Sequence, residues 1–176
     1  EDGYLCWINI QGLEIERCSN PFQDRFICDE SFIKNKIPFI LDWIDLQSKQ
    51  LNKYKWGGTL GPDFDCSGLI QAAFMSQDIY IPRDSYQIMR FCRHLFNFPI
   101  KIDQLQMGDL LFFGTNNVCD HIAIYFQHGI YYHSSGIACG RNGISKEKLY
   151  ESQDDDEISK HYRSKLICAG RVTRSY

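Results

Sequence analysis

The hydrophobic pattern of this chain changes its period partway along, and that change limits the folds open to it. Between residues 38 and 96, apolar side chains recur three or four positions apart, which is the spacing of amphipathic helices. From residue 109 onward, the apolar segments are short and are separated by turn residues, as in β-strands. Helices first and strands afterwards predict an α+β fold, with N-terminal helices packed on a central antiparallel sheet.

The individual elements follow from the same pattern. Asp65 stands at the N-cap position of the second helix, where a carboxylate can accept a hydrogen bond from the first turn. The acidic segment 154–157 is expected to be a solvated loop. Helices are predicted at residues 38–53, 66–76 and 85–96, and strands at 3–10, 109–113, 122–126, 130–134 and 166–172.

Composition excludes several classes of protein. The chain has 176 residues, which is about one domain, and 44% of them are hydrophobic, too many for a disordered chain. The longest apolar run, 122–126, is far shorter than the roughly 20 residues that a membrane span needs. The net charge is −3, and no basic stripe is present. We therefore expect neither a membrane nor a nucleic-acid partner.

The eight cysteines carry information about the cellular compartment. No two of them have the C-x-x-C spacing of zinc ribbons or thioredoxin-like motifs. A chain of this length can bury a sufficient core without four disulfides, so we expect free thiols in a reducing compartment. The printed sequence shows no basic segment followed by an apolar one at its start, so a cytoplasmic location is expected. A periplasmic or secreted location is the alternative, because a signal peptide can have been removed.

Cys66 differs from the other cysteines in its position. It follows the glycine-rich segment 57–61 and is the first residue of the helix predicted at 66–76. A thiol there lies near the positive end of the helix dipole and near unpaired backbone N–H groups, which lower its pKa and favour the thiolate. Cys66 is therefore a candidate nucleophile. The alternative is a buried structural cysteine.

A cysteine nucleophile needs a basic histidine within reach, and that histidine needs a third group to fix its tautomer. His121 comes just before one predicted strand, and His133 lies in the next. A three-residue loop at 127–129 would place both on one face of the hairpin, one diagonal step of ~7–8 Å apart. A two-residue loop would place them on opposite faces. With the longer loop, one imidazole can orient the other.

The sequence favours neither a metal site nor a catalytic role for the other histidines. Zinc sites usually show paired short spacings, which a group of Cys119, Asp120, His121 and His133 lacks. We therefore predict no metal and no cofactor. The remaining histidines are expected at the surface or in structural roles: His94, His161 and His128, the last at the hairpin tip.

Six short motifs follow one another along the chain. They are Tyr54-Lys55-Trp56-Gly57-Gly58, Asp65-Cys66-Ser67-Gly68, Pro82-Arg83-Asp84-Ser85-Tyr86-Gln87, Gly108-Asp109-Leu110-Leu111-Phe112-Phe113, Asp120-His121-Ile122-Ala123-Ile124-Tyr125 and Tyr132-His133-Ser134. Each is weak alone, but the ordered series resembles the NlpC-type cysteine peptidases, papain-like enzymes of bacterial cell-wall metabolism. The resemblance runs from about residue 36 to residue 176, or about four-fifths of the chain.

The resemblance implies a catalytic role for three residues. Cys66 is then the nucleophile, His121 the general base and acid, and His133 the polar third member of the triad. The family cleaves the bond between γ-D-glutamate and a diamino acid in murein stem peptides. The implied substrate is therefore a murein peptide with a free N-terminal L-Ala.

The same resemblance assigns four further residues to the oxyanion and substrate-binding side. Tyr54 matches a tyrosine near the nucleophile that supports the oxyanion site. Asp65 and Ser85 match positions that line the pocket for the free amino end of the peptide, and Ser67 is grouped with them. Physically, Asp65 can pair with that ammonium group, cap its helix, or do both.

The resemblance also implies a domain organisation. Residues 1–15 resemble the end of a bacterial SH3-type domain, residues 16–35 are expected to be a linker, and residues 36–176 form the peptidase domain. An upstream SH3-type domain is then an expected partner in the same chain. The function expected first is a recycling endopeptidase for murein peptides. The alternatives are a secreted hydrolase of intact wall, an amidase or acyltransferase on the same scaffold, and a binding module without activity.

Overall fold

A six-stranded antiparallel sheet forms the centre of the protein in the computed structural model, which describes residues 9–14 and 27–175. The strands lie in the order β1-β6-β2-β3-β4-β5, and every neighbouring pair is antiparallel. The helices are α1 (Glu30–Ser48), α2 (Cys66–Met75), α3 (Ser85–Phe91) and α4 (Glu157–Lys165), with a 3-10 turn η1 (Ile102–Gln104). The strands are β1 (Arg93–Asn97), β2 (Leu110–Thr115), β3 (Val118–Gln127), β4 (Ile130–Ser135), β5 (Gly143–Lys148) and β6 (Leu166–Arg171).

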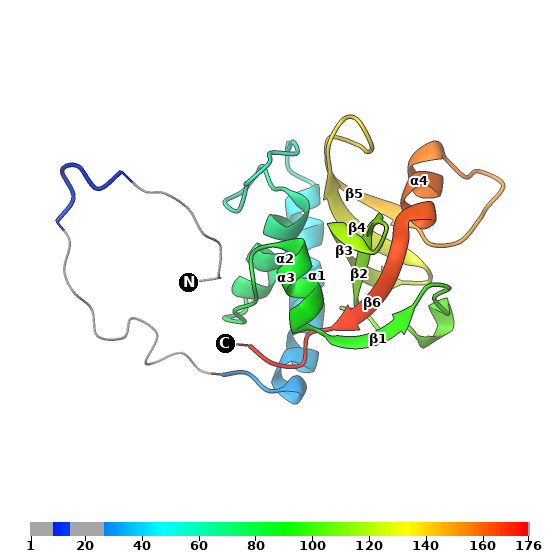
Figure 1. Ribbon diagram of the computed structural model, residues 1–176, viewed down its shortest axis with the longest axis horizontal. Helices are drawn as coiled ribbons and strands as arrows, with labels where there is room; N and C mark the ends of the chain where they lie inside the picture. Colours follow the sequence, from blue (N-terminus) through cyan, green and yellow to red (C-terminus); the bar gives the residue numbers. More distant parts are fainter. Residues whose placement is uncertain (1–8, 15–26, 176) are drawn as a thin grey trace.

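Both faces of the sheet are covered, which explains why β2 is apolar without alternation. Helices α1, α2 and α3 lie together on one side of the sheet, and α4 lies on the other (Figure 1). Leu110 and Phe112 pack with the first three helices, whereas Leu111 and Phe113 pack in a second cluster with Tyr162 of α4. A strand buried on both faces needs apolar side chains in both directions. The predicted α+β fold, with helices packed on an antiparallel sheet, is confirmed.

Each of the four α-helices in the described part of the chain begins at an aspartate cap. The carboxylate accepts a hydrogen bond from a backbone N–H of the first turn, which would otherwise have no partner within the helix. The caps are Asp29 for α1, Asp65 for α2, Asp84 for α3 and Asp156 for α4. The predicted start of the second helix at Cys66 is therefore confirmed.

Three predicted helix boundaries were wrong. The first helix begins at Glu30, inside the segment 16–35 that was expected to be a linker, and ends at Ser48 instead of residue 53; it contains Pro38. Its buried apolar residues include Ile33 and Ile37. The predicted helix lacks them because it was taken to begin at Pro38. The third helix ends at Phe91, and the chain then forms β1 instead of continuing to residue 96.

Strand β5 and helix α4 were not predicted either, and both lie in polar sequence. They carry few apolar residues, so neither shows a clear period. The acidic segment before α4 is not simply a solvated loop: Asp156 caps the helix, and Asp155 forms an ion pair with Arg163. The strand expected at residues 3–10 and the SH3-type segment 1–15 lie largely outside the described residues.

The hairpin between β3 and β4 differs in detail from the predicted one. Its turn has two residues, His128 and Gly129, both with positive φ, which suits the twist of a tight hairpin. The register shifts between Tyr125 and Gln127, a β-bulge that adds one residue to β3. Beyond the bulge the pairing is that of the predicted three-residue loop, because Ile124 lies opposite Tyr132.

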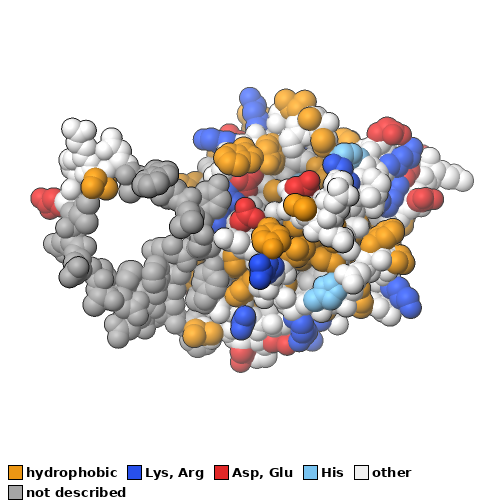
Figure 2. Space-filling view, viewed as in Figure 1, with side chains coloured by type: hydrophobic (Ala, Val, Ile, Leu, Met, Phe, Trp, Pro, Cys, Tyr) orange, Lys and Arg blue, Asp and Glu red, His pale blue; other side chains and the backbone are white. Residues whose placement is uncertain are grey.

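The surface is mixed in charge. Lysine, arginine and acidic side chains are interspersed over the described face shown in Figure 2, with apolar side chains between them. Such an arrangement produces no strong field of one sign over that face. Among the described residues, no helix has the length and apolar character needed to cross a bilayer.

A buried ion pair joins the start of β2 to the end of β6. Asp109 is fully buried, and its carboxylate accepts hydrogen bonds from Arg171 at 2.6 and 2.8 Å and from the backbone of Gln106 at 2.8 Å. Gly108, just before it, has φ +87° and lies against Ile37 of α1, where a Cβ atom would clash. This junction therefore connects the sheet to the helical layer.

We expect Asp109→Asn to lower the free energy of unfolding by about 3 kcal/mol, because it leaves the Arg171 cation without its buried partner. Urea denaturation followed by circular dichroism measures the change. Asp103→Asn in the exposed 3-10 turn is the matched control and should change stability by no more than about 0.5 kcal/mol. Equal stability of the two variants would contradict the role of this ion pair.

Candidate active site

Cys66 lies at the first turn of α2, against the start of β3. Its side chain is buried, with 7% of its surface exposed. The pKa of the thiol is raised to about 11, chiefly by burial and then by the neighbouring Asp65, while hydrogen bonds from the backbone of Ile122 and Ser67 oppose the shift. The prediction that the helix start lowers this pKa was therefore wrong, because desolvation outweighs the backbone groups. The unliganded protein holds a thiol.

His121 and His133 form a direct contact. Nε2 of His121 lies 2.9 Å from Nδ1 of His133, and the rings are close to perpendicular, at 86°. The first side chain is 9% exposed and the second is fully buried. The prediction that one imidazole orients the other is consistent with this geometry. Nδ1 of His121 is the ring nitrogen that this contact leaves available.

Burial also sets the protonation state of these histidines. It lowers the pKa of His121 well below the usual value of 6.5, and the adjacent His133 lowers it further. The pKa of His133 is lowered by burial, although Glu147 partly opposes the shift. Both imidazoles are therefore neutral at pH 7. A neutral imidazole can accept a proton, which is what a general base must do.

Helix α4 supplies an aromatic residue to this cluster. The ring of Tyr162 lies 4.7 Å from that of His121 and 4.6 Å from that of His133, measured between centroids. Tyr162 is buried, and packs on the sheet face opposite α1 to α3. No sequence pattern predicts this contact, because α4 shows no apolar period and Tyr162 lies in no motif.

Asp65 was predicted to cap a helix, to bind a substrate ammonium group, or to do both, but its carboxylate also pairs with Arg83. Oδ1 accepts hydrogen bonds from the Gly68 backbone at 2.6 Å and from Arg83 at 3.0 Å. Oδ2 accepts from the Gly57 backbone at 2.7 Å and from the second guanidinium nitrogen of Arg83. Capping is therefore observed, together with a buried ion pair that the sequence analysis did not anticipate. An ammonium group from a substrate would have to share this carboxylate with Arg83.

The three other predicted binding residues lie around Cys66. Ser67 accepts a hydrogen bond from Arg83 at 2.8 Å. Ser85 is buried at the start of α3 and hydrogen-bonds to Cys119. Burial, with smaller contributions from the nearby Cys66 and Asp65, raises the pKa of Tyr54 to about 12, so its hydroxyl is protonated and able to donate. The backbone of Ile122, which hydrogen-bonds the Cys66 sulfur, connects this group to the adjacent His121 and, through it, to His133.

The residues set aside in the sequence analysis lie elsewhere or lack a ligand geometry. His128 is exposed in the hairpin turn, His94 is exposed on β1, and His161 is partly buried beside Tyr162. Among the described residues, no group of three histidine, cysteine or acidic side chains is arranged to hold a metal ion.

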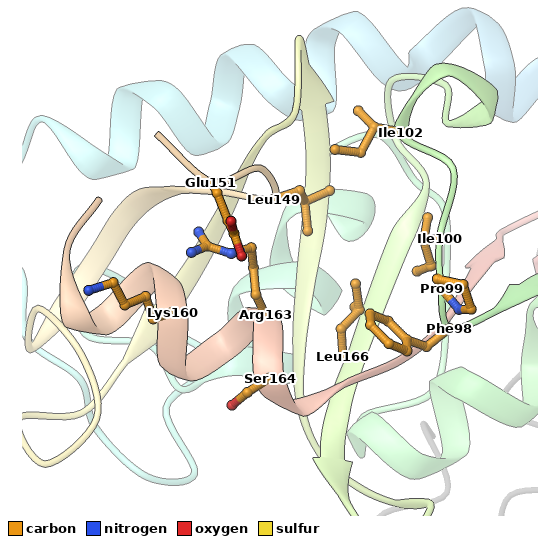
Figure 3. A pocket seen from close by; sticks show the side chains of 10 residues that line it. All are labelled: Phe98, Pro99, Ile100, Ile102, Leu149, Glu151, Lys160, Arg163, Ser164 and Leu166. Carbon is orange, nitrogen blue, oxygen red and sulfur yellow. The ribbon is translucent and has the colours of Figure 1, made fainter. Parts of the chain in front are cut away.

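A well-formed cavity lies away from the histidine pair. It has a volume of about 420 Å³ and lies between α4 and the segment after β1 (Figure 3). Its lining is mainly apolar, with Phe98, Leu149 and Leu166 among the side chains that point into it. None of the seven predicted site residues lines it. This cavity is therefore separate from the candidate active site.

Known proteins share both the sequence and the fold. Residues 51–164 match the model of the NlpC/P60 family. The dipeptidyl-peptidase 6 of Lysinibacillus sphaericus is 32% identical over 85% of this chain and 46% of its own length. A gamma-D-glutamyl-L-lysine dipeptidyl-peptidase of Bacillus cereus is 39% identical over 46% of this chain and 24% of its own length. The chain thus spans less than half of these two relatives.

Two solved structures agree with this result. An NlpC/P60 family protein from Bacillus cereus superposes with a TM-score of 0.58 and 28% identity, over 76% of this chain and 40% of that one. The peptidoglycan hydrolase RipB of Mycobacterium tuberculosis shares the fold, with a TM-score of 0.60 and 20% identity over 93% of this chain and 77% of that one. The resemblance predicted from the six motifs is confirmed, and the chain belongs to the NlpC/P60 family of peptidases.

Proposed function

We propose that this protein is a cysteine peptidase that hydrolyses the bond between γ-D-glutamate and a diamino acid, such as diaminopimelate, in murein stem peptides with a free N-terminal L-Ala. The observation that supports it best is the His121–His133 contact beside the backbone that hydrogen-bonds the Cys66 sulfur. A nucleophile, a base and a group that orients the base are the three parts that covalent catalysis requires.

Because Cys66 is a thiol and His121 is neutral, the proton is expected to move during attack. A thiolate–imidazolium pair is not expected in the free protein. His121 takes the thiol proton on Nδ1 as the Cys66 sulfur attacks the carbonyl carbon of γ-D-glutamate. The tetrahedral intermediate expels the diamino acid amine, which receives that proton, and a thioester remains on Cys66. Water then attacks the thioester, with His121 again as the base, and the thiol is restored.

Two hydrogen-bond donors can stabilise the oxyanion of this intermediate. The backbone N–H of Cys66 belongs to the first turn of α2, where such groups have no partner within the helix. The hydroxyl of Tyr54 stays protonated because its pKa is raised to about 12. Donors that are fixed before the reaction stabilise a developing negative charge more than the neutral carbonyl.

The relatives support the substrate class. One is named as a gamma-D-glutamyl-L-lysine dipeptidyl-peptidase. Its name contains both groups of the proposed bond, a γ-D-glutamyl group and a diamino acid. The low exposure of Cys66 also favours a slender peptide over a bulky one. Recycling of free murein peptides is the role we propose.

A second candidate is hydrolysis of intact peptidoglycan. It is favoured by relatives named as the murein DD-endopeptidase MepH of Escherichia coli and the peptidoglycan hydrolase RipB. Incubating the protein with the free tripeptide L-Ala-γ-D-Glu-diaminopimelate and with whole sacculi separates the two, with products identified by mass spectrometry. We expect cleavage of the free peptide. Release of peptides from sacculi alone would contradict the recycling role.

We expect Cys66→Ala to abolish turnover of the tripeptide while the protein stays folded, because the variant has no sulfur to form the thioester. Cys119→Ala is the matched control, since Cys119 is a buried neighbour that the mechanism does not use. Liquid chromatography of the products measures both. Turnover in the Cys66→Ala variant at the wild-type rate would eliminate this nucleophile.

Replacing Tyr54 with Phe should lower kcat about 100- to 1,000-fold, with a smaller effect on KM, because one oxyanion donor is lost. Steady-state kinetics on the tripeptide measure the change, and Tyr80→Phe provides a tyrosine control in the loop before α3. A variant with unchanged kcat would show that Tyr54 does not contact the oxyanion.

The raised pKa of Cys66 predicts a particular dependence of alkylation on pH. With that pKa at about 11, the rate of reaction with iodoacetamide should rise about tenfold per pH unit between about pH 7 and pH 9. The tryptic peptide 56–83 contains no other cysteine, so mass spectrometry can follow Cys66 alone. A rate that is already high and constant below pH 7 would instead indicate a thiolate paired with an imidazolium.

A further inference from the structure

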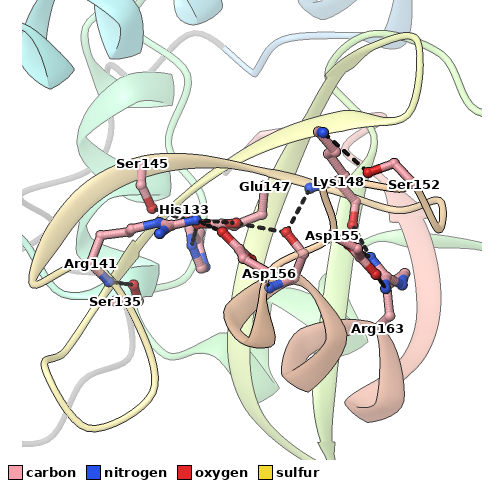
Figure 4. Close-up of polar contacts among 11 residues, drawn as sticks. His133, Ser135, Arg141, Ser145, Glu147, Lys148, Ser152, Asp155, Asp156 and Arg163 are labelled. Carbon is pink, nitrogen blue, oxygen red and sulfur yellow. Dashed lines mark hydrogen bonds and ion pairs between the residues drawn. The ribbon is translucent and has the colours of Figure 1, made fainter.

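A buried glutamate lies behind His133, on the side away from His121. Glu147 comes from β5 and is 2% exposed, and its Oε1 lies 3.9 Å from Nε2 of His133 (Figure 4). No sequence motif included this residue. Its position extends the line from His121 through His133 to a carboxylate in the interior.

The contact involves the one nitrogen of His133 that lacks a hydrogen bond. Nδ1 faces His121, whereas Nε2 is buried and has no hydrogen-bond partner in the described part of the chain. The neighbouring rings of Tyr131 and Tyr162 meet the His133 ring nearly edge-on, at 81° and 84°. A buried N–H group without a partner is unfavourable, so the nearby carboxylate is the natural acceptor.

Glu147 is held in place from the opposite direction. Arg141 donates two hydrogen bonds to it, at 2.9 and 3.2 Å, and Ser159 of α4 donates one at 2.8 Å. Burial alone would raise the pKa of Glu147, but the nearby His133 and the hydrogen bonds from Arg141 and Ser159 outweigh it and lower the pKa. Glu147 is therefore an anion with a fixed position.

The tautomer of His133 follows from these contacts. A carboxylate can only accept, so it favours the proton of His133 on Nε2. Nδ1 then carries a lone pair, and His121 must donate its own Nε2–H to it. That leaves the Nδ1 lone pair of His121 for the thiol proton. In the other tautomer of His133, Nδ1–H would donate to Nε2 of His121. The proton of His121 would then lie on Nδ1, which could no longer act as the base.

We propose that Glu147 is a positioning residue, whose carboxylate fixes the tautomer of His133 and thereby makes Nδ1 of His121 the base. The inference rests on the proposed function, because it concerns the same histidines. When His121 becomes an imidazolium, the same anion stabilises the positive charge through His133. Contacts of this kind are often long in a protein without substrate and shorten during the reaction.

An ion pair with Arg141 alone does not account for this arrangement. The side chain of Arg141 is 43% exposed and also pairs with Asp156 at the surface. A surface carboxylate could satisfy the arginine without desolvation, whereas Glu147 is carried into the interior beside His133. The buried position is what a role in orienting the histidine requires.

The test uses Glu147→Gln, which keeps the shape and removes the charge. Its amide can donate to Nε2 of His133 and so stabilise the other tautomer. We expect kcat on the tripeptide to fall 10- to 100-fold, with KM within about twofold of the wild type. Glu157→Gln removes the same charge from a side chain that is 89% exposed on α4, and should leave both constants unchanged.

Nuclear magnetic resonance of the imidazole nitrogens provides a readout that needs no substrate. In the wild type, His133 should carry its proton on Nε2 and have a bare Nδ1, and Glu147→Gln should reverse this. Because the wild-type spectrum suffices, the inference stays testable if the variant does not fold. A wild type without peptidase activity would contradict the proposed function, but would leave this measurement valid.

Two results would overturn the inference. One is a wild-type His133 protonated on Nδ1. The other is a folded Glu147→Gln variant with wild-type kcat, since a purely structural glutamate would change the melting temperature without changing kcat.

Discussion

The pairing register of β3 and β4 is the constraint on which the rest of the site depends. Two histidines twelve positions apart meet only if their strands place both side chains on the same face of the sheet. The two-residue turn at His128 and Gly129 would by itself put them on opposite faces. The bulge between Tyr125 and Gln127 shifts the register by one residue and brings His121 to His133. A single extra residue in one strand therefore decides whether the base has an orienting partner.

Burial then decides how this pair works. Desolvation disfavours both the thiolate of Cys66 and the imidazolium of His121, so the neutral forms predominate at pH 7. The reaction consequently has to create both charges during attack, in a region that excludes water. Groups that stabilise those charges have a larger effect there than at the surface. This explains why a buried carboxylate lies next to each end of the predicted triad, with Asp65 beside Cys66 and Glu147 beside His133.

The parts of the site that the sequence could predict are those set by local geometry. Asp65 and Cys66 are adjacent in the chain, and a cap followed by a helix fixes their relation. His121 and His133 belong to one hairpin, so their relation could also be estimated, although the bulge was not foreseen. Arg83 and Tyr162 reach the site from other elements through tertiary packing. The family resemblance gave the order of the motifs, but no single-sequence pattern indicates that α4 packs on the histidines.

Two ion pairs, each with a buried carboxylate, flank Cys66 and the two histidines from opposite layers of the fold. Arg83 with Asp65 belongs to the helical side, and Arg141 with Glu147 to the β5 and α4 side. In each, an arginine farther from the reacting group holds the carboxylate in a fixed position. Asp65 tends to raise the pKa of the thiol and so keeps the proton on sulfur in the free protein. Glu147 tends to raise the pKa of His133 and so favours positive charge on the histidine pair once the proton has moved. The free protein is thus kept in its neutral form, and the fixed anions become stabilising as the imidazolium forms. Their positions in the folded protein require no reorganisation at that moment, which is the physical advantage of placing them in the interior.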